Sequence, residues 1–160
     1  MAVGGKRLDS IFSQGPELAA MNVKMSVLAD FASITREGKL NILGIFDEIN
    51  PTSLPTALPI FYIVVVYDAG PAEVGSSKRT ALVLHDADGV VKARLEQSLT
   101  VQPPARAGRR TTMNQVHGVV QFPFDSEGDY QFAILINEQE EGTISLRVNP
   151  PTEEAHATGN

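Results

Sequence analysis

The sequence predicts an all-β fold, namely a two-sheet antiparallel β-sandwich of about eight strands. Apolar and polar residues alternate along short segments, as they do in strands that bury one face. Turn signals separate these segments, and the chain of 160 residues holds 13 glycines and 10 prolines to supply them. No segment between the turns carries a convincing helical period. An immunoglobulin-like and a jelly-roll order need a similar number of strands, so the sequence leaves both open.

Each expected strand is an alternating segment between two turn signals. The strands are expected, in chain order, at about residues 22–31, 40–49, 60–68, 78–85, 90–101, 113–122, 130–136 and 144–148. The first two are joined by a turn at 36–39, where Gly38 is free to adopt a positive φ. A proline-rich, extended connection over 50–59 leads to the third strand.

The later strands are defined in the same way. The segment Asp86-Ala-Asp-Gly89 predicts a tight hairpin turn between the fourth and fifth strands. The inward face of the fifth strand is expected to hold Val91, Ala93, Leu95, Leu99 and Val101. The last two strands form a predicted hairpin that buries Tyr130, Phe132, Ile134, Ile136, Ile144, Leu146 and Val148 on one face.

The predicted sandwich domain covers residues 21–149. Residues 1–20 form an expected N-terminal extension, and residues 150–160 form an expected flexible tail. Met21, which opens the first strand, is a possible alternative start of the protein.

Composition narrows the class of protein. The net charge of −6 and the pI of about 5.0 argue against nucleic-acid binding, which favours basic surfaces. The chain has no cysteine, which excludes disulfides, thiolate catalysis and cysteine-based zinc sites. No apolar run is long enough for a membrane-spanning helix, and no signal-peptide pattern is present, so we expect a cytoplasmic protein without membrane contact.

The third expected strand is apolar on both faces. One face fills the sandwich, whereas Ile60, Tyr62, Val64 and Val66 on the other face would meet water. We therefore expect these four residues to form an interface. Two covers remain open: a second subunit in a homodimer, or the N-terminal segment through Ile11, Phe12 and Leu18.

Carboxylates gather in the loops expected at one end of the sandwich. Flexible loop oxygens are the ligands that Ca²⁺ prefers. The candidate calcium ligands are Asp86, Asp88, Asp125, Glu127 and Asp129. The alternative is that these acids belong to ordinary exposed turns. A zinc site using His85 and His117 lacks the usual ligand spacing.

Basic residues mark a loop at the opposite end. Arg106, Arg109 and Arg110 are a candidate contact for an anion or a protein partner. The expected neighbours of this loop are Glu138, Glu140 and Glu141. The alternative is a solvated loop with weak exposed ion pairs.

Four segments carry a resemblance to a known family. They are Leu28-Ala-Asp-Phe-Ala32, the run 37–47, the run 128–136 and Ser145-Leu-Arg-Val148. Over about residues 21–148 the chain resembles a family of uncharacterised bacterial β-sandwich proteins. The resemblance implies a compact sandwich, implies no activity and offers no site residue. The extension 1–20 departs from the family pattern.

The function expected from the sequence is a non-catalytic binding or assembly module. No nucleophile elbow, phosphate loop or dinucleotide motif is present, so we expect no enzyme activity. The module is expected to self-associate, or to dock its N-terminal segment, through the apolar third strand. A module that binds Ca²⁺ or another ligand at the acidic loops is the alternative; otherwise no cofactor is expected.

Overall fold

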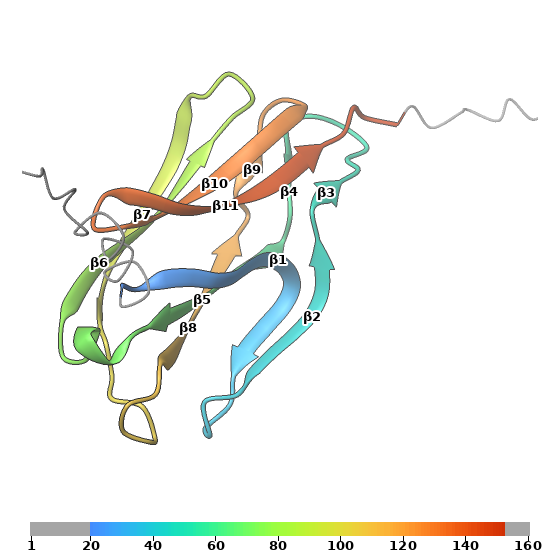
Figure 1. Ribbon diagram of the computed structural model, residues 1–160. Helices are drawn as coiled ribbons and strands as arrows, with labels where there is room; N and C mark the ends of the chain where they lie inside the picture. The colour runs from blue at the N-terminus through green and yellow to red at the C-terminus, as the bar shows by residue number, and fades with distance from the viewer. Residues whose placement is uncertain (1–19, 153–160) are drawn as a thin grey trace, which may run out of the picture.

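In the computed structural model, residues 20–152 form two main β-sheets that pack face to face (Figure 1). One sheet has the order β2-β1-β5-β8, with bounds Leu40–Phe46, Asn22–Ile34, Ile60–Ala69 and Thr111–Val120. The other has the order β3-β11-β10-β6-β7, with bounds Glu48–Ile49, Gln139–Val148, Gly128–Ile136, Ser77–His85 and Val91–Thr100. A short pair joins β4 (Thr56–Ala57) to β9 (Pro123–Phe124), and a 3₁₀ helix, η2 (Pro71–Glu73), follows β5.

The predicted all-β antiparallel sandwich is confirmed. Each of the eight expected strands is present, and the expected second strand divides into β2 and β3. The β3 segment changes sheet and pairs in parallel with β11, while the other ladders are antiparallel.

The strand order is immunoglobulin-like. After β5 the chain crosses to form the β6–β7 hairpin, returns to pair β8 with β5, and crosses again to pair β10 with β6. The hydroxyl of Tyr130, near the start of β10, donates a hydrogen bond of 2.8 Å to the carbonyl oxygen of Ser126. This arrangement is the tyrosine corner of immunoglobulin-like sandwiches, in which a tyrosine bonds back to the chain a few residues upstream. The structure therefore decides between the two orders that the sequence left open.

The main core lies between the two sheets. Phe61 from β5 contacts Phe124 and Phe132, with ring centroids 6.3 and 6.4 Å apart. Phe124 in turn meets Tyr130 edge-on at 5.3 Å. These aromatic contacts join the sheets close to the tyrosine corner, where Phe61, Phe124 and Tyr130 are all buried.

A second core lies on the outer face of the β5–β8 pair. Strand β1 pairs with β5 only as far as Ala29, and its second half pairs with β2. Figure 1 shows β1 bending where this change occurs. The β1–β2 hairpin then lies over β5 and reaches β8, where the side-chain amide of Asn114 donates to the carbonyl oxygen of Gly38 at 3.2 Å. The second core consists of Ala32, Val64 and Val66, flanked by Val27, Leu40, Ile42, Tyr62 and Val116.

Gly44 supports the bend of this hairpin. Its φ is +69°, a value that residues with a Cβ adopt only with strain. A Cβ at this position would lie 2.2 Å from the Oδ2 atom of Asp30 on the paired strand. Both the backbone conformation and the space therefore require glycine here.

Two strand faces differ from expectation. Strict alternation along the sequence places His117 and Gln115 on the outward face of their strand, but they pair with Ile63 and Val65 and face the opposite sheet. The outward face of β8 holds Val116 instead, which the β1–β2 hairpin covers. On β7 the expected inward residues Val91 and Leu95 are 55% and 46% exposed. A register shift at the start of β7 places Val91 opposite His85, and Leu95 is exposed because β7 is the last strand of its sheet.

Candidate functional site

Two of the four predicted interface residues are already covered by the chain itself. Val64 and Val66 are buried beneath the β1–β2 hairpin. The expectation that a second subunit or the N-terminal segment must cover them is therefore corrected. Ile60 is 43% exposed and Tyr62 is partly exposed. The N-terminal residues Ile11, Phe12 and Leu18 lie outside the described part of the chain.

The exposed remainder of this face is a continuous apolar strip, which we call the outer patch. Phe31 and Leu43 face each other across β1 and β2, and the ring of Phe31 meets that of Tyr62 at 5.5 Å. Ile60 pairs with Val120 at the other end of the strip. Leu43 and Val120 are 69% and 67% exposed. The outer patch comprises Phe31, Leu43, Ile45, Ile60, Tyr62 and Val120.

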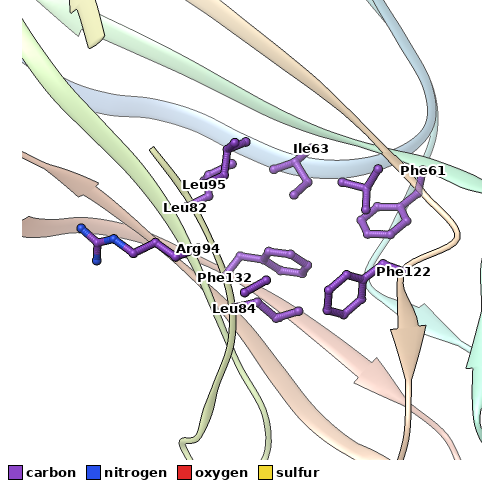
Figure 2. Close-up of a pocket in the computed structure, with 10 residues that line it drawn as sticks. Phe61, Ile63, Leu82, Leu84, Arg94, Leu95, Phe122 and Phe132 are labelled. Atoms are coloured by element: carbon purple, nitrogen blue, oxygen red, sulfur yellow. The ribbon is translucent and has the colours of Figure 1, made fainter. Parts of the chain in front are cut away.

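A small apolar cavity lies between the sheets at their β7–β8 side. Its volume is about 110 Å³. Figure 2 shows Phe61, Phe122 and Phe132 around it, with the guanidinium of Arg94 directed away. The lining side chains are Phe61, Ile63, Leu82, Leu84, Ala93, Leu95, Val119, Phe122 and Phe132, with Arg94 beside them. The cavity offers apolar contact and no acid–base group.

The acidic loops do meet at one end, as expected. The connection at 50–59 joins the loop after β8 through the β4–β9 pair, and a Cβ on Gly128 would lie 2.8 Å from the Cβ of Ala87. The candidate calcium ligands are nevertheless not assembled into a site. Within residues 20–152, no three side chains of His, Cys, Asp or Glu lie close enough together to hold a metal ion.

Two of these acids have other partners. Asp86 accepts the backbone N–H groups of Asp88 and Val90 at 3.0 and 2.9 Å, and its Oδ2 lies 3.3 Å from the Nζ of Lys92. The hydrogen bond from Val90, followed by Lys92, lowers the pKa of the Asp86 carboxyl. Asp129 pairs with Arg147 at 3.1 Å. Asp86 therefore acts as a turn residue, which is the alternative that the sequence offered. Among the described residues, Asp125 and Glu127 do not belong to any cluster of three possible metal ligands.

The basic loop also has different partners from those expected. Arg110 pairs with Asp68 at the end of β5 and donates to the carbonyl oxygen of Ala20 at 3.2 Å. Glu138 pairs with Arg94 at 2.9 Å instead of with this loop. Arg106 and Arg109 are exposed in a turn, where the N–H of Arg109 donates to the carbonyl oxygen of Arg106 at 3.3 Å. Arg110 therefore helps to hold the backbone at Ala20, just before β1, against the end of β5.

The polar groups between the sheets are neutral. Gln115 donates to the hydroxyl of Thr80 at 3.4 Å, beside the buried Tyr67. Burial raises the pKa of Tyr67 to about 12, so its hydroxyl stays protonated at neutral pH. Burial also lowers the pKa of His117. In the described part of the chain, no Asp, Glu, Lys, Arg or His is fully buried, so the core offers no strongly perturbed carboxylate or amine for catalysis.

Sequence reasoning missed most of the outer patch. The signal was present in Leu40-Asn-Ile-Leu-Gly-Ile-Phe46, where apolar residues fall on both faces of one strand. Leu40 and Ile42 cover β5, whereas Leu43 and Ile45 face water. Two neighbouring strands that are both apolar on both faces indicate a folded-over hairpin.

Comparison with known proteins gives a family match. A family model described as a family of unknown function (DUF6941) matches residues 24–149. No curated protein matches the chain. Within residues 20–152 there is no helix with the length and apolar character needed to cross a membrane.

Similar solved structures share little sequence with the chain. A Pseudomonas fluorescens alkylpurine DNA glycosylase bound to DNA containing an abasic site analog is 11% identical over 89% of this chain, with a TM-score of 0.45. The chain spans only 36% of that enzyme's length. An immunoglobulin-like protein from Pseudomonas aeruginosa is 12% identical over 82% of this chain and 98% of its own, with a TM-score of 0.40.

A third similar structure is the CARDB domain of a Pyrococcus furiosus protein in complex with di-metal ions. It is 9% identical over 80% of this chain and 90% of its own, with a TM-score of 0.37. The immunoglobulin-like assignment of the present chain rests on its own strand order and tyrosine corner.

Proposed function

This chain belongs to the family of unknown function DUF6941, and we propose that it is a non-catalytic assembly module that self-associates through the outer patch. The single observation that supports the proposal is the outer patch itself. Its six apolar side chains lie on four adjacent strands and are continuous with one another. Soluble proteins seldom leave such a strip uncovered unless it is a contact surface.

The composition of the outer patch favours a second copy as its occupant. None of its six residues is charged, so two copies of the strip can face each other without opposing like charges. A two-fold contact pairs one surface with itself, and such contacts are the commonest in soluble homo-oligomers. Phe31 and Tyr62 at its centre are the aromatic type that dominates contact energies.

The test is the mass of the protein in solution. Sedimentation velocity over a range of concentrations is expected to show self-association of the full chain. The double substitution Leu43→Lys and Ile45→Lys places two charges in the outer patch and is expected to abolish that contact. The matched control is Val74→Lys, which introduces a charge at an exposed valine beside η2, away from the outer patch.

Two outcomes contradict the proposal. The first is a double variant that associates as strongly as the wild type. The second is a chain beginning at Met21 that associates far more strongly than the full chain, because residues 1–20 would then be the cover of the outer patch.

A further inference from the structure

Strand β7 ends the five-stranded sheet and has a free edge. Within residues 20–152, only β6 pairs with it. On its inward side Leu95 is 46% exposed, and on its outward side Arg94 and Glu96 flank it. An edge strand with exposed apolar residues on one face is a template for another strand.

The backbone of β7 presents unpaired groups along this edge. The N–H of Val101 donates to the carbonyl oxygen of Ser76, and the carbonyl oxygen of Val101 accepts from the N–H of Gly75. Residues of an antiparallel strand alternate in the direction of their backbone groups. The backbone groups of Arg94 and Glu96 consequently point away from β6, toward the free edge.

The charges of β7 distinguish the ways in which it can pair with itself. In an antiparallel pair, opposed residues share a face, so a two-fold axis between two β7 strands passes through a residue position. An axis at Arg94 opposes that arginine to itself, and an axis at Glu96 opposes two carboxylates. An axis at Ala93 opposes Arg94 to Lys92 of the other copy.

An axis at Leu95 gives the complementary arrangement. It opposes Arg94 to Glu96 of the second copy twice, once on each side of the axis. On the inward face it brings Leu95 against Leu95 of the second copy. The backbone groups of Arg94 and Glu96 point to the free edge. Across the axis these two residues can therefore form backbone hydrogen bonds as well as a side-chain ion pair.

We propose that β7 pairs antiparallel with β7 of a second copy of this chain, with Leu95 at the two-fold axis. The contact joins two five-stranded sheets into one continuous sheet and covers Leu95. Within one copy, Arg94 lies 2.7 Å from Glu96 and 2.9 Å from Glu138, so pairing across the axis exchanges the Arg94–Glu96 contact within one strand for the same contact between two strands. This contact is separate from the outer patch, which lies on the other sheet.

The test is a charge exchange followed by sedimentation velocity. The single substitutions Arg94→Glu and Glu96→Arg each oppose like charges across the axis, and each is expected to weaken this contact at least ~10-fold. The double substitution Arg94→Glu with Glu96→Arg restores opposite charges and is expected to restore association. The control is Arg147→Glu, a charge reversal at an exposed position of β11. Circular dichroism melting checks that each variant is folded.

The pattern of masses separates this contact from the one at the outer patch. If both contacts form, the wild type exceeds a dimer, the outer-patch variant and each single-charge variant stop at dimers, and their combination is monomeric. If only the β7 contact forms, the wild type is a dimer, the outer-patch variant stays a dimer, and each single-charge variant is monomeric. A wild-type monomer overturns the β7 contact, as does a double-charge variant that associates no better than the single variants.

Discussion

The burial of Val64 beneath the β1–β2 hairpin leads to a quantitative prediction. Val64 is 0% exposed, whereas Val74, which lies beside η2 and outside both proposed contacts, is 37% exposed. Val64→Ala removes two buried methyl groups, worth about 1.6 kcal/mol in transfer free energy at about 0.8 kcal/mol each. The cavity that remains raises the expected loss of unfolding free energy to about 2–3 kcal/mol.

The matched control is Val74→Ala, which removes the same atoms from an exposed site and should change the unfolding free energy by less than about 0.5 kcal/mol. Urea unfolding followed by circular dichroism measures both values. In thermal melts the Val64 variant should lose about 5–10 °C, because a domain of this size loses roughly 2–4 °C per kcal/mol. Equal losses for the two variants would show that the hairpin does not cover β5, and the second core would then be refuted.

Three further predictions concern the hairpin, the tyrosine corner and pH. Gly44→Ala should destabilise the fold more than Gly38→Ala: both residues have positive φ, but only the first would place its Cβ against another side chain; equal melting temperatures would contradict this. Tyr130→Phe removes the hydrogen bond to Ser126 and should lower the unfolding free energy by about 1–2 kcal/mol in urea, whereas an unchanged midpoint would mean that the corner adds no stability. Burial lowers the folded-state pKa of His117, so below pH ~6.5 the unfolded chain binds a proton more readily than the folded chain does. The free energy of unfolding therefore decreases as the pH is lowered. His117→Gln should flatten that fall in melts between pH 7 and 5, values that bracket the ordinary histidine pKa; an equally steep profile would assign the fall to other groups.

Much of the fold was predictable because a period of two is a local property. Alternation located every long strand, and the acidic loops expected at one end of the sandwich do meet there. The strand order was not predictable from alternation. It depends on which distant strands pair, and its local signature was a single residue, Tyr130, whose hydroxyl bonds only four residues upstream.

The candidate sites were harder to predict because they depend on what covers each face. The outward face of β5 was correctly recognised as apolar, but its main cover is a hairpin that bends at Ala29, and the sequence gives no register for that bend. The same ambiguity reversed the expected direction of His117. For Asp86 the sequence left a metal site and an ordinary turn both open, and in the structure the backbone N–H groups of Asp88 and Val90 donate to its carboxylate.

The parallel pairing of β3 with β11 has a consequence for biosynthesis. Glu48 and Ile49 lie opposite Arg147 and Val148, so β3 pairs with a segment that is synthesised 99 residues later. During translation the first sheet can assemble from β1, β2, β5 and β8, but the partner of β3 is still inside the ribosome. Contacts between such distant residues slow folding, since a long loop must close before they form. A nascent chain stalled before Gln139 would therefore expose half-built sheets to chaperones.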